Sequence, residues 1–208
     1  MKRDRQRSER SVARPMPEQL SEEERRYLLT LARQSIQAVL NRNPKPKINL
    51  ETLTPALRQN GASFVTLTRK GRLRGCIGTL EAHQPLAIDV QTRAIQAATE
   101  DYRFDPLSPA ELDQVKIEIS RLTAPVPLVY DAPEQLPARL VPHRDGVVLE
   151  DGHRRATFLP QVWEELPDPR EFLSHLCLKM GAPADLWQHR LLEVSIYQVE
   201  EFSESDQE

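Results

Sequence analysis

Apolar residues recur at helical spacing in three long stretches of the chain. Ser21 and Glu24 have the spacing of a capping box, and the apolar positions after them predict a helix through residue 40: Leu28, Leu31, Ala32, Ile36, Val39 and Leu40. A second helix is predicted to start at Pro85. A third is predicted between Asp168, its N-cap, and Gly181, its stop signal.

Two hairpins are predicted by β-rich runs on either side of turn residues. The runs ASFVTLTR and LRGCIGTL flank Lys70-Gly71, and GVVLEDGHRRATF pivots on Asp151-Gly152, a dipeptide suited to a type I′ turn. The run VKIEISRL alternates apolar and polar positions, LLEVSIYQVEEF predicts one last strand, and residues 54–61 predict a short helix that ends at its glycine. Because hairpins and helices are mixed, the fold class is predicted as α+β, with a largely antiparallel sheet flanked by helices.

Composition changes this picture only at the ends of the chain. A length of 208 residues fits one domain, which we place at residues 18–203. Residues 1–17 contain six basic and two acidic side chains and no apolar anchor, so a disordered basic tail is expected, and residues 204–208 form an acidic tail. No run of 18 apolar residues and no secretory signal is found, and two distant cysteines fit reduced thiols, so the cytoplasm is the expected location.

The strand that contains LRGCIG carries the first candidate site. Strict alternation would put two arginines and the thiol on one face of the strand. That face would carry Arg72, Arg74, Cys76 and Gly78, and the other face would carry Leu73, Gly75 and Ile77. Nearby positive charge lowers the pKa of a thiol and favours the reactive thiolate. Three interpretations stay open: a buried structural cysteine, a ligand pocket that uses Arg74 and the strand amides, and a nucleophilic Cys76.

Further candidates are single polar residues in other elements. Glu118 interrupts an apolar run, so its carboxylate either faces solvent or pairs with an arginine. Arg103 lies just past a helix end together with Asp101, which fits an ion pair or contact with substrate. Lys179 either complements its helix dipole or shares a pocket with the other candidates. The histidines show no metal-ligand spacing and no phosphate-binding loop is found, so no metal is indicated and the cofactor is unknown.

The sequence resembles the AMMECR1 family, the protein A component of the AmmeMemoRadiSam group. The resemblance is carried, in the family's order, by FVTL, LRGCIGTL, RFDPLSPAEL, IEIS, GVVLE, ATFLPQVWEE and FLSHLCLKMGAPADLW. It implies an α/β architecture with a larger and a smaller subdomain, and radical SAM and Memo-like proteins as partners. It implies no particular reaction.

Two classes of function follow from these residues, with a weaker third. The first is an enzyme or enzyme component that binds a small anionic or modified substrate in a cleft lined by the LRGCIG strand, where Cys76 or Glu118 does the chemistry. Its substrate-binding residues would be Arg74, Gly75, Gly78, Arg103 and Lys179. The second is a non-catalytic adaptor that binds a partner protein, with Cys76 only structural. Nucleic-acid binding is the third and weakest, because the basic residues lack interleaved aromatic residues. No association with a membrane is indicated.

Overall fold

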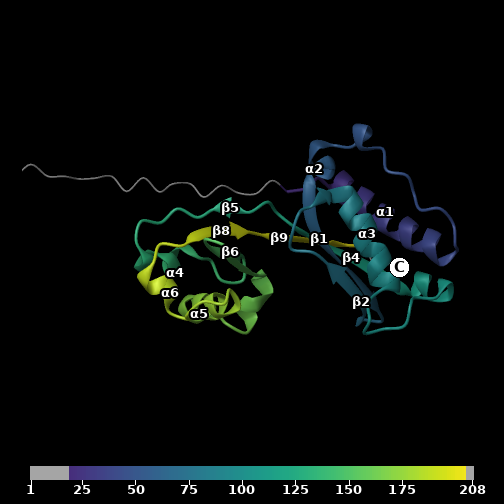
Figure 1. Ribbon diagram of the computed structural model, residues 1–208. Helices are drawn as coiled ribbons and strands as arrows, with labels where there is room; N and C mark the ends of the chain where they lie inside the picture. Colours follow the sequence, from purple (N-terminus) through teal and green to yellow (C-terminus); the bar gives the residue numbers. More distant parts are fainter. Residues whose placement is uncertain (1–18, 205–208) are drawn as a thin grey trace, which may run out of the picture.

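The chain folds into two lobes, each built on an antiparallel sheet. The computed structural model describes residues 19–204, and Figure 1 shows the lobes side by side. We call residues 20–123 and 198–204 the large lobe and residues 124–197 the small lobe. All strand pairings in both sheets are antiparallel, which confirms the predicted fold class.

The large lobe is a five-stranded sheet covered on one face by two helices. Its strands run in the order β2-β1-β4-β9, and β3 also pairs with β1. Their bounds are β1 Asn60–Arg69, β2 Arg72–Gly78, β3 Gln84–Pro85, β4 Val115–Leu122 and β9 Val199–Ser203. The helices α1 (Glu22–Leu40) and α3 (Leu86–Thr99) bury their apolar stripes against Val65, Leu67 and Ile117. The side chains of alternate strand positions therefore point to the opposite face, which we call the outer face.

The small lobe packs short helices on a four-stranded sheet. Its order is β5-β8-β6-β7, with bounds β5 Val126–Pro127, β6 Gly146–Asp151, β7 Arg154–Phe158 and β8 Glu193–Tyr197. Its helices are α4 Leu136–Arg139, α5 Pro169–Lys179 and α6 Leu186–His189. The core contains Trp163 stacked on Phe172 with 3.7 Å between ring centroids. A smaller apolar cluster joins the two sheets: Ala62, Leu122, Val148 and Tyr197.

Short helical turns complete the connections between these elements. They are α2 Pro55–Arg58 and the 3-10 helices Leu50–Thr52, Pro109–Gln114, Pro133–Gln135 and Pro160–Glu164. The 3-10 helix Pro109–Gln114 packs beside α1 and contains Glu111, which contacts Arg74 of β2.

Most predicted signals act where the sequence places them. Ser21 and Glu24 form both hydrogen bonds of the capping box, and Asp168 accepts hydrogen bonds from the backbone N–H groups of α5. Lys70 and Gly71 both have positive φ (51° and 72°), as a type I′ turn requires. The three long helices and the first hairpin are therefore confirmed.

Three local predictions are wrong, each for a tertiary or steric reason. The short helix ends at Arg58 and Gly61 belongs to β1, because pairing with β3 extends that strand. In the second hairpin Asp151 pairs with Arg154, so the turn is centred on residues 152–153, and only Gly152 has positive φ, as in a type II′ turn.

The last predicted strand is two strands in different sheets. The run passes from β8 in the small lobe to β9 in the large lobe, and the break falls at Gln198. At this point the Thr123 N–H donates to the Gln198 carbonyl, and the Gln198 N–H donates to the Thr123 hydroxyl oxygen; Thr123 lies between β4 and β5. Both chain crossings between the lobes therefore lie side by side.

The expected terminal tails fall mostly outside the described residues. Residues 1–17 and 205–208 lie outside them, but Glu204 is described and accepts hydrogen bonds from Arg33 on α1. Within residues 19–204, no helix has the length and apolar character needed to cross a membrane.

Candidate functional site

Cys76 lies in the middle of β2, at the edge of the large sheet, and points to the outer face. It is half-buried and sits opposite Thr66 of β1, whose hydroxyl donates a hydrogen bond to the sulfur over 3.3 Å. Its own backbone N–H and C=O point away from β1, which makes Cys76 and Thr66 a non-hydrogen-bonded pair with close side chains. The thiol therefore has a polar neighbour and is not part of the apolar core.

Two side chains from the segment after α3 cover the backbone of Cys76, and we call Asp101 and Arg103 the edge clamp. The Cys76 N–H donates to Asp101 Oδ2 over 2.8 Å, and Arg103 Nη2 donates to the Cys76 carbonyl over 3.1 Å. Arg103 Nε and Nη2 also donate to the Asp101 carboxylate over 2.9 and 2.7 Å. The clamp thus replaces a neighbouring strand at this edge.

The electrostatics of the clamp follow from this geometry. Asp101 is buried, and the hydrogen bonds from Arg103 hold the pKa of its carboxyl group well below the usual range. The same pairing raises the pKa of Arg103. Arg103 is therefore a fixed cation at the backbone of Cys76.

A bulge in β2 overturns the predicted distribution of side chains between the two faces. Leu67 pairs with Gly75, but Thr68 pairs with Leu73, so Arg74 is the extra residue of a β-bulge and has no partner on β1. Because a side-chain face alternates with every residue, the extra residue moves Leu73 onto the outer face with the thiol. The prediction that the thiol shares its face with two arginines is therefore wrong.

Arg74 binds to groups at the helix-covered side instead. Its guanidinium donates to Glu111 over 3.2 Å and to the Asp105 carbonyl over 3.0 Å, and Arg69 also contacts Glu111. Hydrogen bonds from Arg74 are the main reason that the pKa of Glu111 falls to about 2. Arg72 pairs with Arg69 and so also lies off the face of the thiol.

The two glycines of the strand are required by close packing. A Cβ atom on Gly75 would lie 2.1 Å from the Ala97 carbonyl oxygen of α3, and one on Gly78 would lie 2.2 Å from the ring of Phe64. The Cys76 amide between them already donates to Asp101. The structure thus gives these residues a packing reason that does not depend on a bound anion.

A row of polar side chains crosses the outer face next to the thiol. Cross-strand pairing places Cys76, Thr66, Glu118 and Ser203 on β2, β1, β4 and β9 in that order. Such neighbours have Cβ atoms about 4.5–5.5 Å apart. Ile117 is fully buried on the other face, which confirms the predicted alternation around Glu118. Among residues 19–204, the Glu118 side chain has no hydrogen bond or ion pair.

The predicted residues therefore separate into three places. Cys76, Arg103 and Glu118 come together on or beside the outer face, while Arg74 is engaged by Glu111. Lys179 is held in the small lobe, where its ammonium donates to the Thr157 carbonyl over 2.9 Å and lies 4.9 Å from the centre of the Phe158 ring. Thr66 and Ser203 were missed, because only the strand register shows that they share the row.

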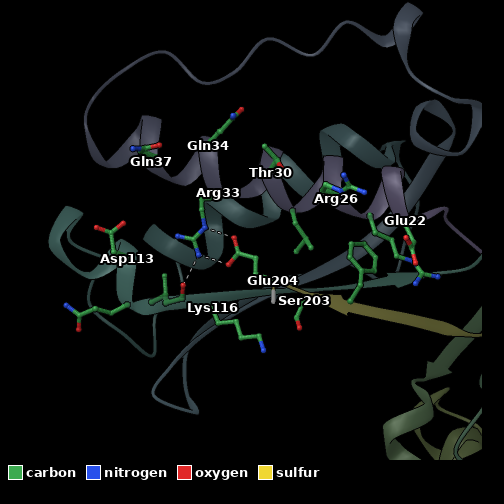
Figure 2. A pocket seen from close by; sticks show the side chains of 15 residues that line it. Glu22, Arg26, Thr30, Arg33, Gln34, Gln37, Asp113, Lys116, Ser203 and Glu204 are labelled. Atoms are coloured by element: carbon green, nitrogen blue, oxygen red, sulfur yellow. Dashed lines mark hydrogen bonds and ion pairs between the residues drawn. The ribbon is translucent and has the colours of Figure 1, made fainter. Parts of the chain in front are cut away.

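A groove lies elsewhere in the large lobe, between α1 and β9. Figure 2 shows this groove of about 1270 Å³ with Arg33 and Glu204 bonded to each other at its centre. Arg33 also donates to the Leu112 carbonyl of the 3-10 helix Pro109–Gln114 and to the Val115 carbonyl of β4, so the pair ties α1 to the sheet. Most of the N–H donors of Arg33 are used in these hydrogen bonds. Within residues 19–204, no three His, Cys, Asp or Glu side chains are grouped to hold a metal ion.

Comparison with known proteins gives one consistent result. The family model AMMECR1 matches residues 29–202. A protein of Thermofilum pendens is 43% identical over 197 residues, which cover 89% of this chain and 92% of the relative. A protein of Methanothermobacter thermautotrophicus is 39% identical over 186 residues, which cover 89% of this chain and 96% of the relative.

A solved structure shares both the fold and the sequence. The crystal structure of an uncharacterized protein from Pyrococcus horikoshii matches with a TM-score of 0.64 and 34% identity. The match covers 86% of this chain and 90% of that chain. Since a family model and relatives above 30% identity both span most of the sequence, the chain belongs to the AMMECR1 family.

Proposed function

We propose that this protein is an enzyme or enzyme component whose reactive group is the Cys76 thiol and whose substrate carries an anionic group. The observation that supports this most directly is the Thr66 hydroxyl, which donates to the sulfur over 3.3 Å. A donor to the sulfur stabilises the thiolate relative to the thiol, because hydrogen bonding to the charged form favours that form. The thiolate is the nucleophile in cysteine chemistry.

Of the two arginines that the sequence predicts to bind substrate, Arg103 is the one to which we assign the anion. A guanidinium has five N–H donors, and three of its hydrogen bonds here use Nε and Nη2. Within residues 19–204, Nη1 makes no hydrogen bond, so its two N–H groups are available to a carboxylate or phosphate of the substrate. The clamp with Asp101 fixes this donor beside the thiol.

Glu118 is proposed as the acid or base of the site. Its carboxylate lies in the same row as the thiol, with Thr66 between them, and it has no partner among residues 19–204. A carboxylate within reach of a bound substrate can take or return a proton during the reaction. Association with radical SAM and Memo-like proteins, and a cytoplasmic location, stay predictions beside this proposal; the two free cysteines support the location.

The test is the rate of thiol alkylation at neutral pH, read by mass spectrometry for both cysteines in one sample. Cys76 should react faster than Cys177, because the thiolate is the reactive form and a donor to the sulfur favours it. Cys177 is the internal control, because burial raises the pKa of its thiol. Thr66→Val should slow the alkylation of Cys76, and Thr66→Ser should restore the rate because serine keeps the hydroxyl.

A matched control separates this effect from general charge. Arg74→Ala should leave the alkylation rate of Cys76 unchanged, because Arg74 is engaged by Glu111 and Asp105. If Cys76 alkylates no faster than Cys177 at neutral pH and Thr66→Val changes nothing, the thiol is structural. The adaptor function would then be the better proposal.

A further inference from the structure

Exposed apolar side chains of the large lobe gather along the edge strand that carries the thiol. Tyr102 is 94% exposed, Leu73 44% and Leu80 36%, and within the described residues these are the exposed large hydrophobic side chains of this lobe. Tyr102 lies between the two residues of the edge clamp, and the bulge places Leu73 on the face of the thiol. Exposed apolar groups that cluster in this way mark interaction surfaces.

The same edge is strongly basic. The hairpin residues 69–74 include four cations, and the contacts of Arg69 and Arg74 converge on the single carboxylate of Glu111. Lys70 and Arg72 are exposed and have no ion pair among residues 19–204. A fixed excess of positive charge attracts an acidic partner and steers its approach.

The shape of the site favours a macromolecular substrate over a free metabolite. Small-molecule sites are usually concave and bury most of the ligand. Neither the groove at α1 nor a smaller hollow around Gln161 is lined by Cys76, which lies on the edge strand of its sheet. Tyrosine and arginine, by contrast, are the residues enriched among those that carry the energy of protein interfaces.

We propose that the substrate of Cys76 is carried on a protein segment that is acidic and apolar, and that this segment docks along β2. Tyr102 and Leu73 would contact its apolar side chains, while Arg72 and Lys70 would attract its acidic residues. The inference rests on the proposed reactivity of Cys76 and adds the class of substrate. It also gives Tyr102 a role in specificity.

The test compares one electrophile on three carriers. A chloroacetyl group is attached to a peptide of Glu, Leu and Phe residues, to the same peptide with Lys in place of Glu, or is supplied as free chloroacetamide. In each case the Cys76 sulfur forms a bond to the methylene carbon and chloride leaves with the bonding electrons. The rate of Cys76 alkylation is measured against reagent concentration by mass spectrometry of the full chain.

The acidic peptide should react with saturation and roughly tenfold faster than the lysine peptide at low concentration. Tyr102→Ala combined with Arg72→Gln should lower the peptide rate by roughly tenfold, a typical effect for such contacts, and leave the chloroacetamide rate unchanged. Leu178→Ala is the matched control, since Leu178 is 56% exposed but lies in the small lobe. It should change neither rate.

Three outcomes would overturn the inference, and they can be told apart. If Cys76 reacts with chloroacetamide but neither peptide shows saturation or preference, the protein substrate is wrong while the proposed thiol chemistry stands. If Cys76 is inert to chloroacetamide as well, both proposals fail. If single-stranded DNA, and not an unreactive acidic peptide, protects Cys76 from chloroacetamide, the basic edge binds nucleic acid instead.

Discussion

The Asp101→Asn variant tests whether the edge clamp holds β2 in place. Asp101 accepts hydrogen bonds from the backbone N–H groups of Cys76 and Arg103 and from the Arg103 guanidinium. Asparagine keeps the shape but loses the charge and turns an NH₂ group toward these donors. The clamp should therefore weaken while the local backbone keeps its course.

The magnitude follows from the kind of bonds that are lost. Hydrogen bonds to charged groups contribute about 1.5–3 kcal/mol, against about 1 kcal/mol for neutral ones. Arg103 is partly exposed and regains water, so the lower part of this range applies and we expect a loss of about 2 kcal/mol. With a urea m-value of about 2 kcal/mol/M, the unfolding midpoint should fall by about 1 M.

The pH dependence of this loss has a definite sign. The pKa of Asp101 is lowered in the folded protein, so its contribution to the free energy of unfolding is complete above the unfolded pKa of about 3.9. It is lost as the pH falls through the lower, folded pKa. Urea unfolding at pH 7 and pH 3 should therefore show a full difference between the wild type and Asp101→Asn at pH 7 and a smaller one at pH 3.

Asp105→Asn is the matched control. Asp105 is exposed, and within residues 19–204 its carboxylate makes no hydrogen bond, so the unfolding midpoint should stay unchanged. Equal midpoints for Asp101→Asn and the wild type at pH 7, or a difference that grows at pH 3, would refute the account of the clamp.

Two further changes test the surroundings of β2. Gly75→Ala should lower the thermal unfolding temperature by at least about 5 °C, because the new Cβ meets the Ala97 carbonyl at 2.1 Å. Gly71→Ala should lower it less, because space is open there and only the φ of +72° is unfavourable. A larger loss for Gly71→Ala than for Gly75→Ala would contradict this packing. Glu111→Gln should destabilise the protein at pH 7, and this difference should fade between about pH 4.5 and the folded pKa of about 2, because the lowered pKa contributes stability only above that window. A difference that is constant with pH in urea unfolding would show that the ion pair with Arg74 contributes nothing.

The local signals of the sequence were sufficient for most elements. The capping box at Ser21, the Lys70-Gly71 turn and the alternation around Glu118 each act within a few residues, so they can be seen in the sequence. The assignment of Cys76 and Arg103 to one site also came from the sequence, and the structure places them in direct contact. What they do chemically is still a proposal.

The remaining features depend on residues that are far apart in the chain. Whether Arg74 shares a face with Cys76 is decided by a bulge, which exists only because β1 and β2 pair with an offset. The split of residues 191–202 into β8 and β9 depends on which sheet each half joins, and the partner of Arg74 lies in a separate 3-10 helix.

The sequence by itself thus determined the elements, their caps and turns, and the residue types around the thiol, because propensity and periodicity are properties of neighbouring residues. Only the tertiary structure decided the strand register, and with it the row of Cys76, Thr66 and Glu118 and the clamp of Asp101 and Arg103. The physical reason is that a shift of one residue reverses every side chain in a strand. Pairing between distant segments sets that shift, and no local pattern encodes it.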